Sequence, residues 1–403
     1  MANLTFLCIS FYFKGEEFLR SCKEAGNTVY LLTAKKLEDK PWPKESVDEF
    51  FYMDDDSNTP ENIHNIVKGV AWLMQERKID AVVALDDFDV EKAASVREEL
   101  RIPGMGLTTS RYFRDKLAMR IQARDAGIRV PAFTSLFHNE DINRFADETP
   151  TPWLLKPRSE ASATGIKKVH SKEELWEQIH NLGERRYEYL AERFRPGDVY
   201  HSDSLTYKNK VAFCLSSRYL NTPFEVAHGE GIFRSMTLDS KSKDAKTLEK
   251  LNAKVMKAFG MQYSASHTEF IKSHEDSEFY FLETSSRVGG AHLAVMIEAA
   301  TGINLWAEWA KIETAVRNGT EWKLPNARKD FAGILISLAR FEHPDMSKFD
   351  VQEIVWKMNE RYHVGFVVKS ADQNRIIELL NNYADLVFKE YHAGMPLGDK
   401  PSA

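Results

Sequence analysis

The chain has 403 residues, of which 43% are apolar and 28% are charged, a composition typical of globular proteins with a sizeable core. Lysine and arginine total 54 and aspartate and glutamate total 60, which gives a net charge of −6. This weakly acidic balance argues against a general affinity for nucleic acid or for an anionic membrane. The three cysteines form no Cys-x-x-Cys pair, so neither a disulfide framework nor a zinc site is indicated.

The N-terminal segment, MANLTFLCISFYFKGEE, lacks a basic stretch followed by a long apolar one, so it predicts a strand and not a signal peptide. No apolar run approaches the roughly 20 residues that a helix needs to span a bilayer. We therefore expect a cytoplasmic protein without membrane or nucleic-acid partners.

Roughly the first hundred residues alternate between short apolar runs and helical patterns. The apolar runs, typical of buried parallel strands, are Leu4–Ser10, Thr28–Thr33 and Asp80–Leu85. Helical patterns are found in Gly15–Ala25, Pro60–Lys78 and Asp89–Leu100. This alternation predicts an open parallel βαβ sheet. Asp86 and Asp87 follow its third strand, where they either line a substrate pocket or cap the next helix.

The remainder of the chain predicts an α+β mixture with antiparallel strand pairs. Predicted helices are Thr108–Ala126 (a single helix ended by Gly127), Lys172–Leu182, Thr247–Phe259, Leu293–Thr314 and Asp372–Glu390. Predicted strands are Trp153–Lys156, Lys167–His170, Tyr189–Phe194, Ser202–Tyr207, Val211–Ser216, His267–Lys272, Phe279–Glu283, Ala332–Leu338 and Gly365–Lys369.

A lysine followed by a loop of small residues is the first chemical signal. Lys156 ends an apolar strand in the segment WLLKPRSEASATGIKKV, and a second strand follows the loop. Small side chains allow backbone N–H groups to approach phosphate oxygens, and the lysine charge offsets the phosphate charge. The loop is not a Walker A sequence, because no GKS or GKT follows. Alone, the segment is also compatible with an ordinary β-hairpin that carries an exposed lysine.

Two carboxylates on successive strands are the second signal. Glu269 lies in SHTEFIK and Glu283 ends the strand in FYFLETSSR, a pair that suits a hard cation such as Mg²⁺. Arg287 follows and precedes a Gly-Gly pair, an arrangement that suits a carboxylate or phosphoryl group. A solvated surface pair of acids remains the alternative. The histidines of this region lack metal-ligand spacing, and His267, two residues before Glu269, is the one nearest these acids.

Five segments in order resemble the ATP-grasp superfamily: RDKLAMRIQARDAGIRVP, WLLKPRSEASATGIKKV, YLAERFRPGD, HTEFI and FLETSSRVGG. The similarity extends from about Ser110 to Ala310 and is greatest to carboxylate–amine ligases and the biotin-carboxylase-like branch. The resemblance implies an N-terminal βαβ domain (residues 1–107), two ATP-grasp subdomains of α+β type that clamp ATP (108–190 and 191–325) and a small C-terminal α+β region (326–403).

The resemblance also implies roles for individual residues. Lys116 and Lys156 resemble the two phosphate-contacting lysines, and Glu269 and Glu283 the Mg²⁺ ligands. Arg287 is the group expected to stabilise an acyl phosphate. The expected nucleotide contacts are the loop residues Ser159, Ser162, Thr164 and Gly165, the adenine acid Glu192, the hinge residues Arg193 and Phe194, and Asp198 near the ribose.

One departure from the family pattern affects the metal site. The family often shows Glu-x-Asn-x-Arg, whereas Ser285 occupies the Asn position here. Serine is a poorer ligand than asparagine, so a second metal would rely more on Glu283.

The implied function is an ATP- and Mg²⁺-dependent ligase (with Mn²⁺ as a possible substitute) that activates a carboxylate as an acyl phosphate for attack by an amine, releasing ADP and phosphate. Its partners are small-molecule carboxylates and amines, and the resemblance makes a homodimer possible. The alternatives are a biotin-carboxylase-like enzyme that uses bicarbonate, although the chain lacks an MKM-type biotinylation site, and an ATP-binding protein that has lost catalysis.

Overall fold

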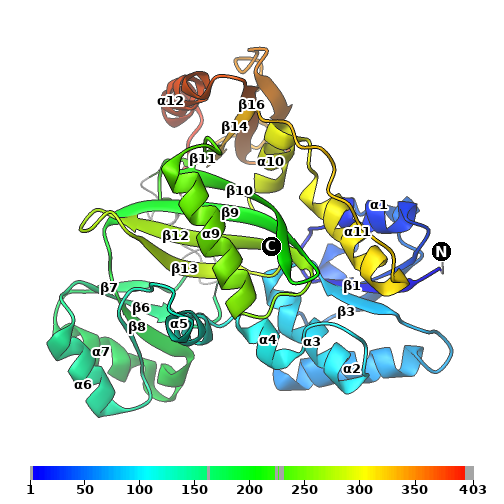
Figure 1. Ribbon diagram of the computed structural model, residues 1–403, viewed down its shortest axis with the longest axis horizontal. Helices are drawn as coiled ribbons and strands as arrows, with labels where there is room; N and C mark the ends of the chain where they lie inside the picture. Colours follow the sequence, from blue (N-terminus) through cyan, green and yellow to red (C-terminus); the bar gives the residue numbers. More distant parts are fainter. Residues whose placement is uncertain (1–2, 161–163, 223–225, 227–230, 395–403) are drawn as a thin grey trace.

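The computed structural model describes residues 3–160, 164–222, 226 and 231–394. Figure 1 shows three lobes: an N-terminal α/β lobe, a small sheet with two helices, and a large sheet that continues into the C-terminal lobe. Among the described residues, no helix is both long enough and apolar enough to cross a membrane.

The N-terminal lobe is the open parallel sheet that the sequence predicts. Its strands pair in the order β3-β2-β1-β4, with bounds Thr5–Ser10 (β1), Thr28–Ala34 (β2), Glu49–Met53 (β3) and Ala81–Ala84 (β4). The accompanying helices are Glu16–Glu24 (α1), Pro60–Leu73 (α2) and Val90–Glu99 (α3), with 3-10 turns at Lys35–Leu37, Lys44–Ser46 and Asp87–Asp89. The edge strand β3 was not predicted.

The predicted single helix Thr108–Ala126 is wrong, because the structure contains two helices, α4 (Leu107–Arg111) and α5 (Lys116–Asp125). Asp115 separates them: its carboxylate accepts hydrogen bonds from the backbone N–H groups of Leu117 and Ala118 and so caps α5. It also forms an ion pair with Arg158, which directly follows the strand Trp153–Pro157. Gly127, in the left-handed region at φ 67°, ends α5 as predicted.

The small sheet is antiparallel with the order β5-β8-β6-β7. Its strands are Phe133–Ser135 (β5), Trp153–Pro157 (β6), Lys167–Val169 (β7) and Tyr189–Arg193 (β8). Two helices and one 3-10 turn accompany them: α6 (Asn139–Glu148), α7 (Lys172–Leu182) and Gly183–Glu188. The core of this lobe lies between the sheet and the two helices and includes Trp153, Leu175 and Ile179.

The large sheet has eight strands in the order β13-β12-β9-β10-β11-β14-β16-β15. Their bounds are Gly197–Tyr207 (β9), Lys210–Tyr219 (β10), Phe233–Thr237 (β11), Ser264–Ser273 (β12), Phe279–Ser285 (β13), Phe331–Leu338 (β14), Ile354–Lys357 (β15) and His363–Ser370 (β16). The predicted antiparallel pair around Lys208–Asn209 is confirmed. Because β14, β15 and β16 extend this sheet, the region after residue 325 continues the lobe that precedes it.

Among the described residues, four helices accompany the large sheet: α9 (Lys243–Ala258), α10 (Leu293–Thr301), α11 (Leu305–Asn318) and α12 (Gln373–Glu390). The predicted helix Leu293–Thr314 is therefore divided. The division falls at Gly302, which has φ 77°, and Asn304 then caps α11.

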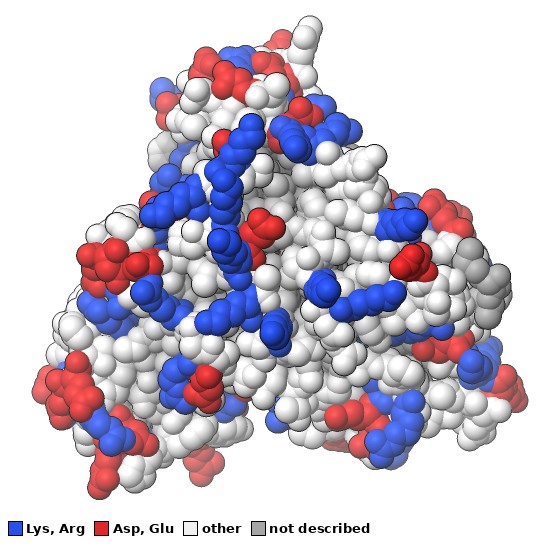
Figure 2. Space-filling view, viewed as in Figure 1, with Lys and Arg blue, Asp and Glu red and all other residues white. Residues whose placement is uncertain are grey.

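The two faces of the sheet have different neighbours. Asn252 of α9 donates to the buried hydroxyl of Ser204 on β9, and Ser204 in turn bonds Ser266 on β12. Residues that alternate with these serines face away from α9. The outer side of α9 carries exposed lysines, which form much of the central basic stripe in Figure 2. These lysines therefore lie on the side of the sheet opposite Asp203 and His267.

The cap at Asp115 gives a stability prediction. Asp115→Ala removes both the cap and the ion pair with Arg158 and should lower the free energy of unfolding by at least about 1–2 kcal/mol, the usual cost of a lost N-cap. Asp115→Asn retains a capping oxygen and should recover most of this loss. Urea unfolding of the two variants measures the difference, and equal losses would contradict the capping role.

Candidate functional site

The two predicted metal-binding acids face each other across adjacent strands. Glu269 on β12 pairs with Glu283 on β13, while the next residue, Phe270, pairs with Phe281. This β-bulge reverses the alternation of β13, so Glu283 leaves the face on which Phe281 packs against α9. Without the bulge, a carboxylate two residues after a core phenylalanine would point into the core.

Helix α5 places the first predicted lysine beside these acids. The Nζ atom of Lys116 lies 3.0 Å from Oε2 of Glu283 and donates to the carbonyl oxygen of Glu160 at 2.6 Å. Burial alone would raise the pKa of Glu283, but the Lys116 ammonium holds this pKa well below its usual value, at about 2. Glu283 is therefore a carboxylate at any pH near neutrality.

The second predicted lysine belongs to a buried ionic triad. Lys156 on β6 lies 2.7 Å from one oxygen of Glu192 on β8, and Arg120 of α5 lies 2.5 Å from the other. Burial would raise the pKa of Glu192, but the two cations lower it below its ordinary value. Arg120 also donates to the carbonyl oxygen of Leu282, next to Glu283. The triad thus joins the small sheet, α5 and the large sheet.

The other predicted nucleotide contacts are spread along the connection between the two sheets. The backbone N–H of Arg193 bonds the carbonyl of Ala132, and that of Phe194 bonds the carbonyl of Pro152. The ring of Phe194 lies 3.9 Å below the Lys168 ammonium. Asp198 lies further on, in β9, where it pairs with Arg218 at 3.1 Å; no described contact links it to Lys156 or Glu192.

The predicted phosphate loop is described at its two ends. Ser159 is exposed and Thr164 is buried. Gly165 has φ 71°, and a Cβ there would lie 2.9 Å from the Pro157 ring, so both conformation and space favour glycine. Ser162 lies outside the described residues.

Arg287 connects the large sheet to the N-terminal lobe. Its guanidinium forms an ion pair with Asp87, which follows β4, and donates to the Val288 carbonyl at 2.7 Å. The neighbouring Asp86 accepts a hydrogen bond from the backbone N–H of Phe88. Asp86 therefore caps the 3-10 turn Asp87–Asp89 and not the predicted helix itself, which begins after this turn. The ion pair of Asp87 connects the carboxyl edge of the parallel sheet to Arg287.

Sequence reasoning assigned no role to Arg120 or Tyr219. Arg120 follows Lys116 by one helical turn, so the i, i+4 spacing could have indicated that both face the site. Tyr219 on β10 donates to Oε1 of Glu269 at 2.9 Å. Its partner lies 50 residues away in sequence, and no local pattern signals such a contact.

The donor set fits a hard divalent cation. Glu269 and Glu283 offer carboxylate oxygens from adjacent strands, which is the ligand type that Mg²⁺ prefers. Ser285 pairs with His267 two residues along the same strands, and its buried hydroxyl has no hydrogen-bond partner among the described residues. A cation or a coordinated water at the two acids would offer this hydroxyl a partner.

The chain is similar to known ligases in sequence and in fold. No protein-family model matches the chain. The L-arginine-specific L-amino acid ligase of Bacillus subtilis is 23% identical over 298 residues, which cover 72% of this chain and 70% of the relative. A D-alanine–D-alanine ligase of Neisseria gonorrhoeae is 24% identical over 212 residues, or 51% of this chain and 69% of the relative.

Among solved structures, an L-amino acid ligase from Bacillus licheniformis superposes with a TM-score of 0.73 at 19% identity, covering 97% of this chain and 98% of that one. A biotin carboxylase domain of a 2-oxoglutarate carboxylase from Hydrogenobacter thermophilus gives 0.70 at 17% identity, covering 98% and 92%. At these identities the structural likenesses establish the fold alone.

The sequence relatives are ligases of amino acids, and the fold and the order of the site segments are similar to those of ATP-grasp carboxylate–amine ligases.

The buried triad predicts a stability that depends on pH. Glu192→Gln leaves Lys156 and Arg120 without their carboxylate and should cost about 3–5 kcal/mol of unfolding free energy at neutral pH. Because the folded pKa of Glu192 lies below its ordinary value of 4.5, the stability it contributes is complete above that pH and is lost as the pH falls through the folded pKa.

Urea unfolding of the wild type and of Glu192→Gln over a range of pH measures this effect. The difference between the two proteins should be constant near neutrality and should shrink below about pH 4.5. A difference that stayed unchanged down to the acid limit of folding would show that the triad does not hold Glu192 ionised.

Proposed function

We propose that this protein couples ATP hydrolysis to the joining of a small carboxylate and an amine, with the carboxylate activated as an acyl phosphate. The observation that carries the proposal is the meeting of Lys116, Glu283 and Glu269 from one helix and two strands, with the Lys156 triad adjoining them. Lysines placed beside two carboxylates can bind a triphosphate and its divalent cation together, because the lysines bind phosphate oxygens and the acids bind the cation.

The two lysines would bind phosphate oxygens and offset the charge that develops during transfer. A carboxylate oxygen attacks the γ-phosphorus, the bond from that phosphorus to the β–γ bridging oxygen breaks, and ADP leaves. Mg²⁺ or Mn²⁺, held by Glu269 and Glu283, supplies further positive charge beside the phosphates when bound.

Arg287 is proposed to hold the acyl phosphate until an amine attacks its carbonyl carbon and phosphate leaves. The guanidinium already binds one carboxylate, that of Asp87, so its donors are oriented toward an anion. Binding a substrate anion would require Arg287 to share or exchange this partner. The Asp87 contact also makes the N-terminal lobe a candidate wall of the substrate site.

Amino acids are the proposed substrates for both the carboxylate and the amine. The relatives named as L-amino acid and D-alanine ligases support this class, but they differ from one another in the amino acids they join. A phosphate-release screen over pairs of amino acids would identify the pair, and mass spectrometry would identify the dipeptide. Absence of ADP formation with every pair would favour a protein that binds ATP without turnover.

The biotin-carboxylase-like alternative shares the fold but uses different acceptors. ADP release with bicarbonate and free biotin, and not with amino acids, would favour it.

Two substitutions test the proposed site. Lys156→Met and Glu283→Gln should each lower kcat/KM for ATP-dependent ligation by about 100-fold or more, because each removes a charge that faces the transferring group. Lys272→Met is a matched control, since Lys272 lies on β12 but pairs with Asp244 of α9 on the other face of the sheet. The control should retain wild-type kinetics, and wild-type turnover by Lys156→Met would contradict the proposal.

A further inference from the structure

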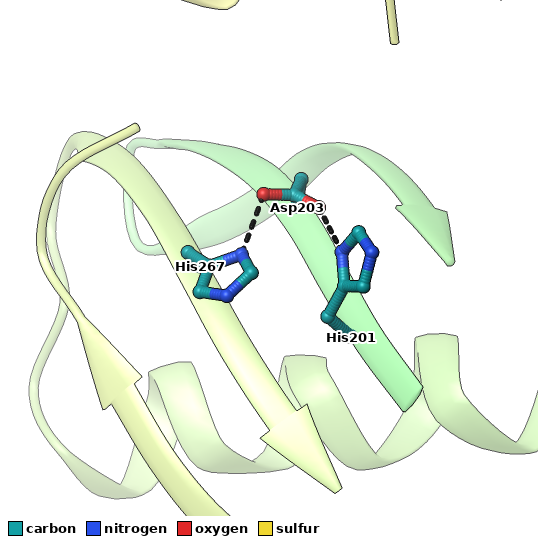
Figure 3. A group of neighbouring side chains, drawn as sticks. All are labelled: His201, Asp203 and His267. Carbon is teal, nitrogen blue, oxygen red and sulfur yellow. Dashed lines mark hydrogen bonds and ion pairs between the residues drawn. The ribbon is translucent and has the colours of Figure 1, made fainter. Parts of the chain in front are cut away.

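Behind Glu269, two buried side chains and one partly buried side chain form a continuous series of hydrogen bonds. Figure 3 shows His201 and Asp203 on β9 and His267 on the neighbouring strand β12. Nδ1 of His201 lies 2.6 Å from one oxygen of Asp203, and Nδ1 of His267 lies 2.8 Å from the other. Asp203 and His201 have no solvent exposure.

The composition resembles a metal centre, but the atoms that would bind a metal are already engaged. Both oxygens of Asp203 accept hydrogen bonds, and Nε2 of His201 lies 2.7 Å from the hydroxyl of Ser235. The spacings of 2.6 to 2.8 Å are those of hydrogen bonds, which leave no room for an ion between the atoms. The group is therefore a series of hydrogen bonds that begins at the hydroxyl of Ser235 and ends at Nε2 of His267.

Nε2 of His267, the last atom of this hydrogen-bonded series, lies beside the proposed metal ligand Glu269. Nε2 of His267 is 3.5 Å from Oε1 of Glu269, and the hydroxyl of Tyr219 is 2.9 Å from that same oxygen. The strand register places His267 opposite Asp203 and Glu269 opposite His201, so the four side chains share one face of the sheet. His267 and Tyr219 therefore both lie beside Oε1 of Glu269 and leave Oε2 available.

We propose that Ser235, His201, Asp203, His267 and Tyr219 form a positioning network that fixes one oxygen of Glu269 so that the other faces the divalent cation. Asp203 is the centre, because its two oxygens set the ring orientation of both histidines. This inference rests on the proposed function, in which Glu269 binds the cation. Partners of this kind behind a metal ligand commonly affect metal affinity by 10- to 100-fold.

The network also supports the backbone that carries Arg287. A Cβ on Gly289 would lie 2.8 Å from Oδ1 of Asp203 and 2.9 Å from Nδ1 of His267. The glycine therefore packs directly on the hydrogen bond between these two side chains. Close approach to the network therefore explains the first glycine of the Gly-Gly pair after Arg287.

The decisive variant is Asp203→Asn, which keeps the side-chain volume. Asparagine can accept one imidazole hydrogen bond, but its amide nitrogen is a donor and opposes the second. In Asp203→Asn, the affinity of the full-length protein for Mn²⁺ in the presence of ADP should fall by 10- to 100-fold. Electron paramagnetic resonance of the free Mn²⁺ measures this affinity. ADP affinity without metal should change less than about twofold, because the network does not contact the Lys156 triad.

Tyr219→Phe tests the same idea without disturbing the buried aspartate and should weaken Mn²⁺ binding by about 10-fold. Thr268→Val is the matched control: Thr268 adjoins Glu269, but its hydroxyl bonds Thr284 at 2.7 Å in the strand pair, on the alternate face. The control should retain wild-type Mn²⁺ affinity.

Glu269→Gln separates the hypothesis of a metal site at Glu269 from the hypothesis of a positioning network behind it. If it weakens Mn²⁺ binding while Asp203→Asn and Tyr219→Phe, both folded, bind Mn²⁺ as the wild type does, the positioning network is overturned and the metal site stands. If Glu269→Gln leaves Mn²⁺ binding unchanged, the metal site itself is wrong and the network falls with it. Should Asp203→Asn fail to fold, Tyr219→Phe alone decides between these outcomes.

Discussion

The site depends on one helix whose two cations bind two different sheets. Lys116 and Arg120 are one turn apart on α5; Lys116 pairs with Glu283 of the large sheet and Arg120 with Glu192 of the small sheet. Arg120 additionally bonds the Leu282 carbonyl. Because Arg120 and Glu192 are buried, the loss of either would leave the charge of the other uncompensated. This pair therefore couples the position of the small sheet to that of the carboxylates on the large sheet. Any movement between the sheets must therefore rearrange this helix.

Much of the fold could be predicted from local patterns, and the errors have identifiable causes. The strands that lie inside the parallel sheet, β1 and β2, are largely apolar runs, and both were predicted. Three of the missed strands, β3, β5 and β15, lie at sheet edges, where partial burial weakens the pattern. The missed strand β11 lies inside the large sheet, but it has only five residues and includes the polar Arg234, Ser235 and Thr237. Helix boundaries failed at Asp115 and Gly302, where a cap and a left-handed glycine interrupt helical periodicity.

The candidate site was predictable only in part, because some of its residues stand in recognisable local patterns and others reach it only through contacts distant in sequence. Lys156 and Glu283 carried strand-end signals, and the structure brings their segments together through Arg120. The partner of Arg120 lies 72 residues away in sequence, so its contribution required the fold. Asp198 had the weakest pattern, and its observed partner is Arg218. The roles of these residues toward a nucleotide remain predictions from the family resemblance.

The bulge at Glu283 explains why the departure at Ser285 is compatible with a metal site. By reversing the alternation of β13, it places Glu283 beside Glu269 and Ser285 beside His267, away from the aromatic core. Two carboxylates thus converge even though the third position offers only a hydroxyl. If the positioning network orients Glu269, the chain compensates for a weaker third ligand by reducing the freedom of the first, since a ligand that is already oriented loses less conformational entropy on binding a cation.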